Sequence, residues 1–147
     1  MTDTGYKPSA SHAYVQKGSS NWAADALADD ACEVSDAMEP GTVAGRTFYI
    51  AATEDNTGPI NGVCTVAILE DCDGTNYEDQ PGLANAQVGG PDKFQFTPVQ
   101  NYTVYVPPFT VSALYHHKYK VAVLNECGQE LAISIWYKDV TIPAASV

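Results

Sequence analysis

Residues 119–142, YKVAVLNECGQELAISIWYKDVTI, carry the clearest secondary-structure signal in the chain. Apolar and polar side chains alternate on both sides of a short polar loop, which is the period expected of half-buried strands. Gly128 lies in that loop and supplies the positive φ that a tight connection needs. The stretch therefore predicts two strands joined as a β-hairpin. The apolar face of its second run consists of Leu131, Ile133, Ile135 and Tyr137.

Similar short runs recur outward from this stretch, separated by loops rich in Gly, Pro and Asn. Residues 62–69, GVCTVAIL, are apolar on both faces, as in a strand inside a sandwich. Pro98, Pro107 and Pro108 confine their positions to strand ends or edges. A chain of 147 residues with this pattern predicts one all-β domain, an antiparallel jelly-roll-like β-sandwich. The predicted runs are residues 46–51, 62–69, 94–97, 103–106, 111–115, 119–124 and 131–142.

The N-terminal residues differ from this pattern. Residues 1–20 are polar and predict an extended arm, with the sandwich domain spanning residues 21–147. The arm has neither a basic n-region nor an apolar h-region, so we expect no signal peptide.

Residues 19–36, SSNWAADALADDACEVSD, allow two interpretations. A helix could start at Ser20 or Asn21, but the aspartates that follow are poor helix formers. We favour an extended lead-in to a strand near residues 32–34, with Trp22 and Leu27 docked on the body. The acidic residues expected to face solvent or a basic partner are Asp25, Asp29, Asp30, Glu33 and Asp36.

The net charge of −11 lies entirely in residues 1–79, which carry fourteen acidic and three basic side chains. This distribution argues against binding to nucleic acid or to an anionic membrane surface, because both require a basic face. No apolar run approaches the ~20 residues that span a bilayer. Docking on a basic protein surface, cation binding and plain solubility all remain compatible with the charge.

The acidic loop at residues 70–79, EDCDGTNYED, is a weak candidate for a calcium site. Carboxylate and amide oxygens are the ligands that Ca²⁺ prefers, but the spacing does not fit an EF-hand. We favour a solvated loop over a cation site, and we expect no cofactor. The candidate ligands are Asp71, Asp73, Asn76 and Asp79.

Four cysteines and three histidines show no zinc spacing. His116 and His117 are adjacent and would point to opposite faces of a strand. Without a secretion signal the cysteines are expected to be thiols, although Cys32 could pair with Cys64 or Cys127 on an exterior surface.

The aromatic zone around Pro107 and Pro108 has three interpretations: a sugar-stacking platform, an intersubunit contact or simply core, of which we favour the last two. No nucleophile, metalloprotease or phosphate-loop motif is present, so an enzyme is the least favoured class. The zone consists of Tyr102, Tyr105, Phe109, Tyr115 and Tyr119.

Three segments resemble jelly-roll structural proteins of tailed bacteriophages. Trp22 followed by residues 25–31, DALADDA, resembles their tryptophan-and-acid opening. Residues 60–68, INGVCTVAI, are similar to their I-x-G-V-x-V-x-I strand, and residues 133–140 resemble their final strand. The resemblance implies a non-enzymatic virion protein, either a capsid decoration (cement) protein or a head fibre.

A decoration protein would bind the outer capsid surface and stabilise the head, after assembly in the host cytoplasm. The resemblance implies two partners, the major capsid protein and the chain itself as a homotrimer. The alternatives are a carbohydrate-binding β-sandwich module and a self-assembling tail, fibre or tube protein. The candidate partner-binding residues are Tyr6, Lys7, His12, Tyr14, Lys17 and Trp22.

Overall fold

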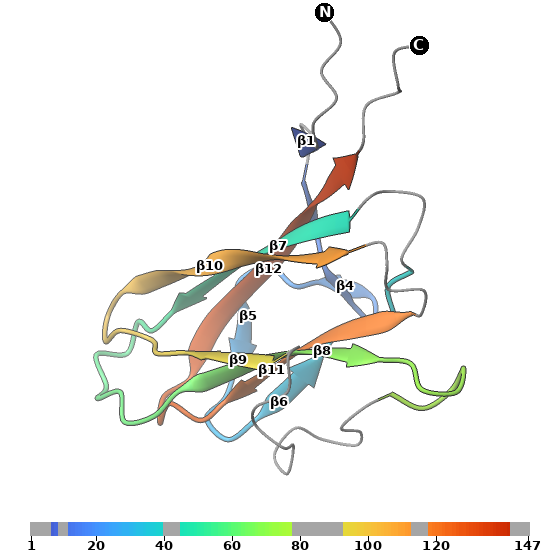
Figure 1. Cartoon of the computed structure of the whole chain (residues 1–147). Helices are drawn as coiled ribbons and strands as arrows, with labels where there is room; N and C mark the ends of the chain where they lie inside the picture. The colour runs from blue at the N-terminus through green and yellow to red at the C-terminus, as the bar shows by residue number, and fades with distance from the viewer. Residues whose placement is uncertain (1–6, 9–11, 40–44, 78–92, 113–117, 142–147) are drawn as a thin grey trace, which may run out of the picture.

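Every regular element that the structure describes is a β-strand (Figure 1). The structure, a computed structural model, describes residues 7–8, 12–39, 45–77, 93–112 and 118–141. The prediction of an all-β fold is confirmed. Over these ranges, no helix has the length and apolar character needed to cross a membrane. The strands are β1 (Lys7–Pro8), β2 (Ala13–Tyr14), β3 (Gln16–Lys17), β4 (Ser20–Asn21), β5 (Asp25–Leu27), β6 (Cys32–Val34), β7 (Gly45–Thr53), β8 (Cys64–Glu70), β9 (Lys93–Phe96), β10 (Thr103–Ser112), β11 (Tyr119–Asn125) and β12 (Leu131–Thr141).

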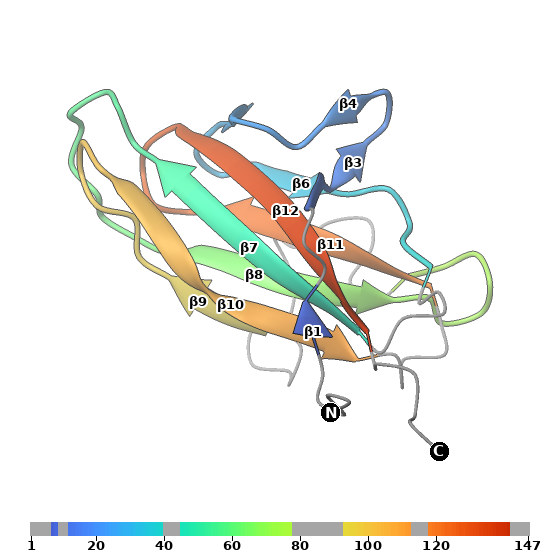
Figure 2. The same ribbon diagram turned by 90° about the horizontal axis from the view of Figure 1, so that it is seen from above.

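Two larger antiparallel sheets form the body (Figures 1 and 2). One has the order β1-β12-β7-β10, with β2 and β5 also paired to β12, and the other has the order β6-β11-β8-β9. From β6 to β12, successive strands change sheet except at the β8–β9 step. This strand order is compatible with the predicted jelly-roll sandwich. A small third sheet pairs β3 with β4.

The predicted hairpin between residues 119–124 and 131–142 is wrong. Both strands exist, but β11 belongs to the four-stranded sheet and β12 to the six-stranded sheet. Each already has neighbours on both sides, β6 and β8 for β11, and β7 and the N-terminal strands for β12. The connection crosses between sheets, and Gly128 has the expected positive φ of 92°. Buried Asn125 fixes the corner by donating to Leu27 O at 3.0 Å and Gln129 O at 2.7 Å.

The inner faces of both sheets contribute to one apolar cluster. Phe48 and Ile50 of β7, together with Ile133 and Ile135 of β12, pack with Val66 of β8 and its neighbours. The predicted apolar face of the last strand is therefore confirmed. Strand β8 is buried on both faces, as its composition predicted, because Ala67 and Leu69 form a second cluster on the opposite side.

Strand β10 is one strand, where the sequence predicted two runs separated by prolines. Its register against β7 shifts between Val106 and Phe109, so Pro107 and Pro108 occupy an irregularity rather than a break. Proline lacks an N–H group and is tolerated at such a position on an edge strand. The strand ends at Ser112; Tyr115, His116 and His117 lie outside the described residues.

The described part of the expected arm is extended, but it is packed on the body. Strand β2 pairs with Trp136 and Tyr137 of β12, and Val15 is fully buried. Val15 N donates to Ile135 O at 3.0 Å, and Ile135 N donates to Trp22 O at 2.9 Å. Residues 13–15 and 22–27 therefore cover one edge of β12, which would otherwise present unpaired backbone groups, while β3 and β4 between them pair with each other.

The lead-in segment is extended, as predicted, and both of its predicted anchors are buried. Trp22 is 0% exposed and Leu27 is 1% exposed. Asp25 and Glu33, which were expected to face solvent or a basic partner, are partly exposed, and both pair with the Lys17 ammonium of the same chain. The cation also lies 5.2 Å from the Trp22 ring centroid. Lys17 thus ties β3 to β5 and β6 across the segment.

Candidate functional site

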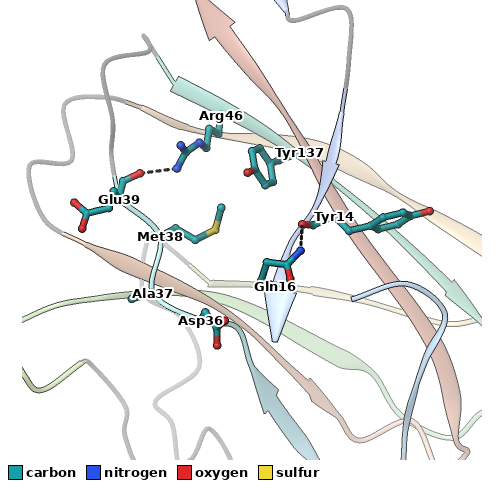
Figure 3. Close-up of a pocket in the computed structure, with 8 residues that line it drawn as sticks. All are labelled: Tyr14, Gln16, Asp36, Ala37, Met38, Glu39, Arg46 and Tyr137. Carbon is teal, nitrogen blue, oxygen red and sulfur yellow. Dashed lines mark hydrogen bonds between the residues drawn. The ribbon is translucent and has the colours of Figure 1, made fainter. Parts of the chain in front are cut away.

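A depression of about 260 Å³ opens near the end of the body where β1 and the last residues of β12 pair (Figures 1 and 3). Its walls come from β2 and β3, the segment after β6, the start of β7 and β12. It mixes aromatic, thioether, guanidinium and carboxylate groups, a composition suited to binding a protein segment rather than a metal ion. It is lined by Tyr14, Gln16, Asp36, Ala37, Met38, Glu39, Arg46 and Tyr137.

Arg46 forms the polar part of this depression. Its Nε donates to Asp139 Oδ1 at 3.0 Å, and Nη1 donates to Glu39 O at 2.5 Å, as Figure 3 shows for the second bond. The guanidinium lies 5.2 Å from the Tyr137 ring centroid. Burial raises the pKa of Tyr119, so its phenol stays protonated beside Arg46. These contacts fix the orientation of the cation before any partner binds.

The opposite wall is built by the N-terminal strands. Gln16 Nε2 donates to Tyr14 O at 3.4 Å and to Asn21 Oδ1 at 2.5 Å. Asp36 N donates to Gln16 O at 2.9 Å, and its carboxylate accepts Gly18 N at 2.8 Å. The wall therefore depends on residues 14–21 staying seated on the body.

An aromatic cluster continues from Tyr14 over the outer face of the six-stranded sheet. Trp136 is paired in register with Tyr14 on one side and Tyr49 on the other. The Trp136 ring stacks on Tyr49 at 5.8 Å and 11°, and it meets Tyr14 edge-on at 6.4 Å. His12 packs edge-on against both Tyr14 and Trp136. His12 and Tyr14 are exposed, so the cluster is accessible to a partner.

The structure brings together two of the six predicted partner-binding residues. His12 and Tyr14 lie in the aromatic cluster, but Lys17 is engaged by its own acids and Trp22 is fully buried. A ring with no exposed surface cannot contact a partner, so Trp22 supports the site from beneath. Tyr6 lies outside the described residues, and only the backbone of Lys7 is described.

The carboxylates of Asp71 and Asp73, two of the predicted calcium ligands, accept hydrogen bonds from N–H groups of their own loop. Asp71 Oδ1 accepts the N–H groups of Asp73 and Gly74 at 3.1 and 2.6 Å. Asp73 Oδ1 accepts Thr75 N at 2.9 Å and Asn76 N at 2.7 Å. These bonds hold the pKa of Asp73 below its ordinary value. Asp79 lies outside the described residues, and among those described no three His, Cys, Asp or Glu side chains gather around a possible ion.

Two of the cysteines flank the Asn125 side chain. The Cys64 thiol donates to Asn125 Oδ1 at 3.5 Å, and Cys127 N donates to the same oxygen at 3.0 Å. Both are fully buried thiols, and burial raises the pKa of each. They act as core residues at the corner between the two sheets.

The predicted aromatic zone is divided by the fold. Tyr119 is buried and Phe109 packs against the core, as the core interpretation predicted for them. Tyr102 and Tyr105 are instead 68% and 72% exposed. Tyr115 lies outside the described residues.

Sequence reasoning missed most residues of the depression and the cluster. Two signals were present: Arg46 is the only arginine in the chain, and Trp136 is a large aromatic residue on the polar face of its strand. Met38, Tyr49 and Tyr137 gave no such signal.

We compared the chain with protein-family models, curated protein sequences and solved structures, and none of them matches it.

Proposed function

We propose that this chain is a non-enzymatic capsid decoration protein that docks on the outer surface of a phage head through the surface around Tyr14. The docking surface consists of the depression and the adjoining aromatic cluster. The observation that carries the proposal is the joining of exposed His12 and Tyr14 to Trp136 and Tyr49 in one continuous aromatic surface. The sequence resemblance to decoration proteins supports the same role.

The composition of the docking surface supports a protein partner. Tyrosine, tryptophan, methionine and arginine are the residues enriched at protein interfaces. Arg46 is already oriented by Asp139 and Glu39, so a partner would find it in place without an ordering cost. Asp36 and Glu39 at the margin suit a basic partner surface.

The anchoring of the N-terminal segment supports a stable rather than a transient contact. Residues 13–15 and 22–27 are held on β12 by backbone bonds, and Val15 and Trp22 of this segment are buried in the core. One side of the docking surface is therefore part of the folded body. A preformed surface loses less conformational entropy on binding than a disordered arm does.

The test is co-sedimentation of the purified full chain with heads that lack it, taken from the phage that encodes it. Saturable binding is expected for the wild type. Tyr14→Ala should weaken binding about tenfold or more, as expected for an aromatic interface anchor. Tyr102→Ala is the matched control, because Tyr102 has the same side chain, is more exposed than Tyr14 and precedes β10, which does not pair with β12. Heads that bind no wild-type chain, or that bind Tyr14→Ala as well as the wild type, would refute the proposal.

A further inference from the structure

Among the described residues, exposed apolar surface is concentrated in residues 99–105. Of the large apolar side chains that the structure describes, four are exposed, and three of them lie within residues 99–105. Val99 is 49% exposed, Tyr102 68% and Tyr105 72%. Two tyrosine side chains that are this exposed and this close together form an unusual aromatic patch on a protein surface, which indicates a binding site.

These tyrosines border a depression of about 410 Å³ where β7 ends and β10 begins. On the outer face of the sheet, the register partner of Tyr105 is Ala51, and the next residue across is Ser134. Both neighbours have small side chains, so the surface next to the Tyr105 ring is shallow. The depression is lined by Thr53, Glu54, Asp55, Asn101, Tyr102, Thr103 and Tyr105.

Glu54 holds the two loops of the depression in a fixed arrangement. Glu54 is only 1% exposed, although the adjacent Asp55 is exposed. Its Oε1 accepts Asn56 N at 2.9 Å and Gly58 N at 3.1 Å, while Oε2 accepts Asn101 N at 2.5 Å. Glu54 N also donates to Tyr102 O at 3.2 Å. A buried carboxylate with this many donors makes the platform rigid, which favours binding with little ordering cost.

The chemistry of the lining narrows the class of ligand. The ionisable side chains on it other than tyrosine are two carboxylates, so an anionic ligand such as a nucleic acid would be repelled. Asp55 is exposed and can only accept hydrogen bonds while ionised, so the ligand must bring donors. A proline-rich peptide brings few backbone N–H donors, because proline has none, and a lone cation would leave most of both rings uncovered.

A neutral glycan meets all of these requirements. The C–H face of a pyranose ring is flat and apolar enough to cover a tyrosine ring, and its hydroxyl groups both donate and accept. We propose that the Tyr102–Tyr105 depression is a second binding site, for a neutral glycan that stacks on both tyrosines and donates hydroxyl groups to Asp55.

The first experiment applies the labelled full chain to an array of neutral oligosaccharides, with sulfated and sialylated glycans on the same array. Binding is expected to one or more neutral glycans and to none of the anionic ones. An array on which no neutral glycan binds, or on which binding is confined to anionic glycans, would overturn the proposal.

The second experiment measures the affinity of the strongest array ligand by titration calorimetry. Tyr105→Ala and Tyr102→Ala should each weaken binding about tenfold. Tyr105→Phe keeps the ring and should bind almost as well as the wild type, whereas Tyr14→Ala should not differ from it. Equal loss with Tyr105→Phe and Tyr105→Ala, or no loss with either alanine variant, would contradict stacking at this site. Head binding is proposed to depend on Tyr14, and glycan binding on Tyr102 and Tyr105. The alanine variants therefore show separately whether each proposal fails.

Discussion

Replacing Trp22 with alanine should destabilise the protein strongly, because the indole is 0% exposed and packs in the main core cluster. A tryptophan buries about 150–250 Å². At about 25 cal/mol per Å², complete loss of that surface corresponds to about 4–6 kcal/mol. Alanine retains part of the burial, so the expected decrease in the free energy of unfolding is about 3–5 kcal/mol.

The loss should be visible in both thermal and urea unfolding followed by circular dichroism. For a domain of this size, each kcal/mol lowers Tm by about 2–4 °C, so a decrease of roughly 10 °C is expected. Trp22→Phe is the matched control. Trp22 Nε1 has no hydrogen-bond partner among the described residues, so loss of the N–H group should cost little. The phenylalanine variant should therefore lose less than half as much stability as the alanine variant.

The same substitution tests the link between the lead-in segment and the docking surface. Trp22 O accepts Ile135 N at 2.9 Å, and Trp22 N donates to Val15 O at 2.8 Å, directly beside Tyr14. Loosening this segment should weaken head binding as well as stability. If Trp22→Ala unfolds within about 1 kcal/mol of the wild type, the segment is not docked as described and the reasoning fails.

Four further predictions follow from other contacts. Glu54→Gln should lower Tm at neutral pH, because the N–H groups of Asn101, Gly58 and Asn56 stabilise the ionised carboxylate and lower the pKa of Glu54. Protonation removes this stabilisation, so the difference in Tm between the variant and the wild type should shrink as the pH falls below about 4.3. A difference that persists in acid would contradict this. Lys17→Met should cost about 1 kcal/mol or less in urea unfolding, and less still at high salt, since its acidic partners are partly exposed; a loss that salt does not reduce would contradict this. Calcium or a chelator should leave Tm unchanged, because the Asp73 carboxylate already accepts hydrogen bonds from N–H groups of its own loop. A rise in Tm with calcium would reveal a calcium site. Light scattering should give the mass of a homotrimer, and a monomer at all concentrations would count against the proposed assembly.

The strands themselves were largely predictable from local patterns. Alternation over two residues depends only on which side chains face the core, and it correctly located β11, β12 and the inner face of β12. A run that is apolar on both faces located β8. Their pairing was not predictable in the same way. Nothing in the local pattern distinguishes a hairpin from a crossing between sheets, because both place apolar faces inward. The corner is fixed by Asn125, whose bond partners include Leu27, which is far away in sequence.

The candidate site was only partly predictable for a related reason. His12 and Tyr14 were expected to meet a partner because they lie in a polar N-terminal segment. Their assembly with Trp136 depends on β2 pairing with the last strand, which no local pattern encodes. Trp22 was correctly expected to dock on the body, and the same burial removes it from the partner-binding set. The pairing of Lys17 with Asp25 and Glu33 was not predictable, because it depends on how the segment between them folds.

The orientation of the protein on a phage head tests the central claim most directly. Heads that lack the chain would be incubated with the purified wild type and reconstructed by electron cryomicroscopy. Added density is expected to contact the shell through the outer face of the six-stranded sheet that carries Tyr14, Trp136 and Tyr49. Density that contacts the shell through the four-stranded sheet instead, or heads without added density at saturating protein, would contradict the proposal.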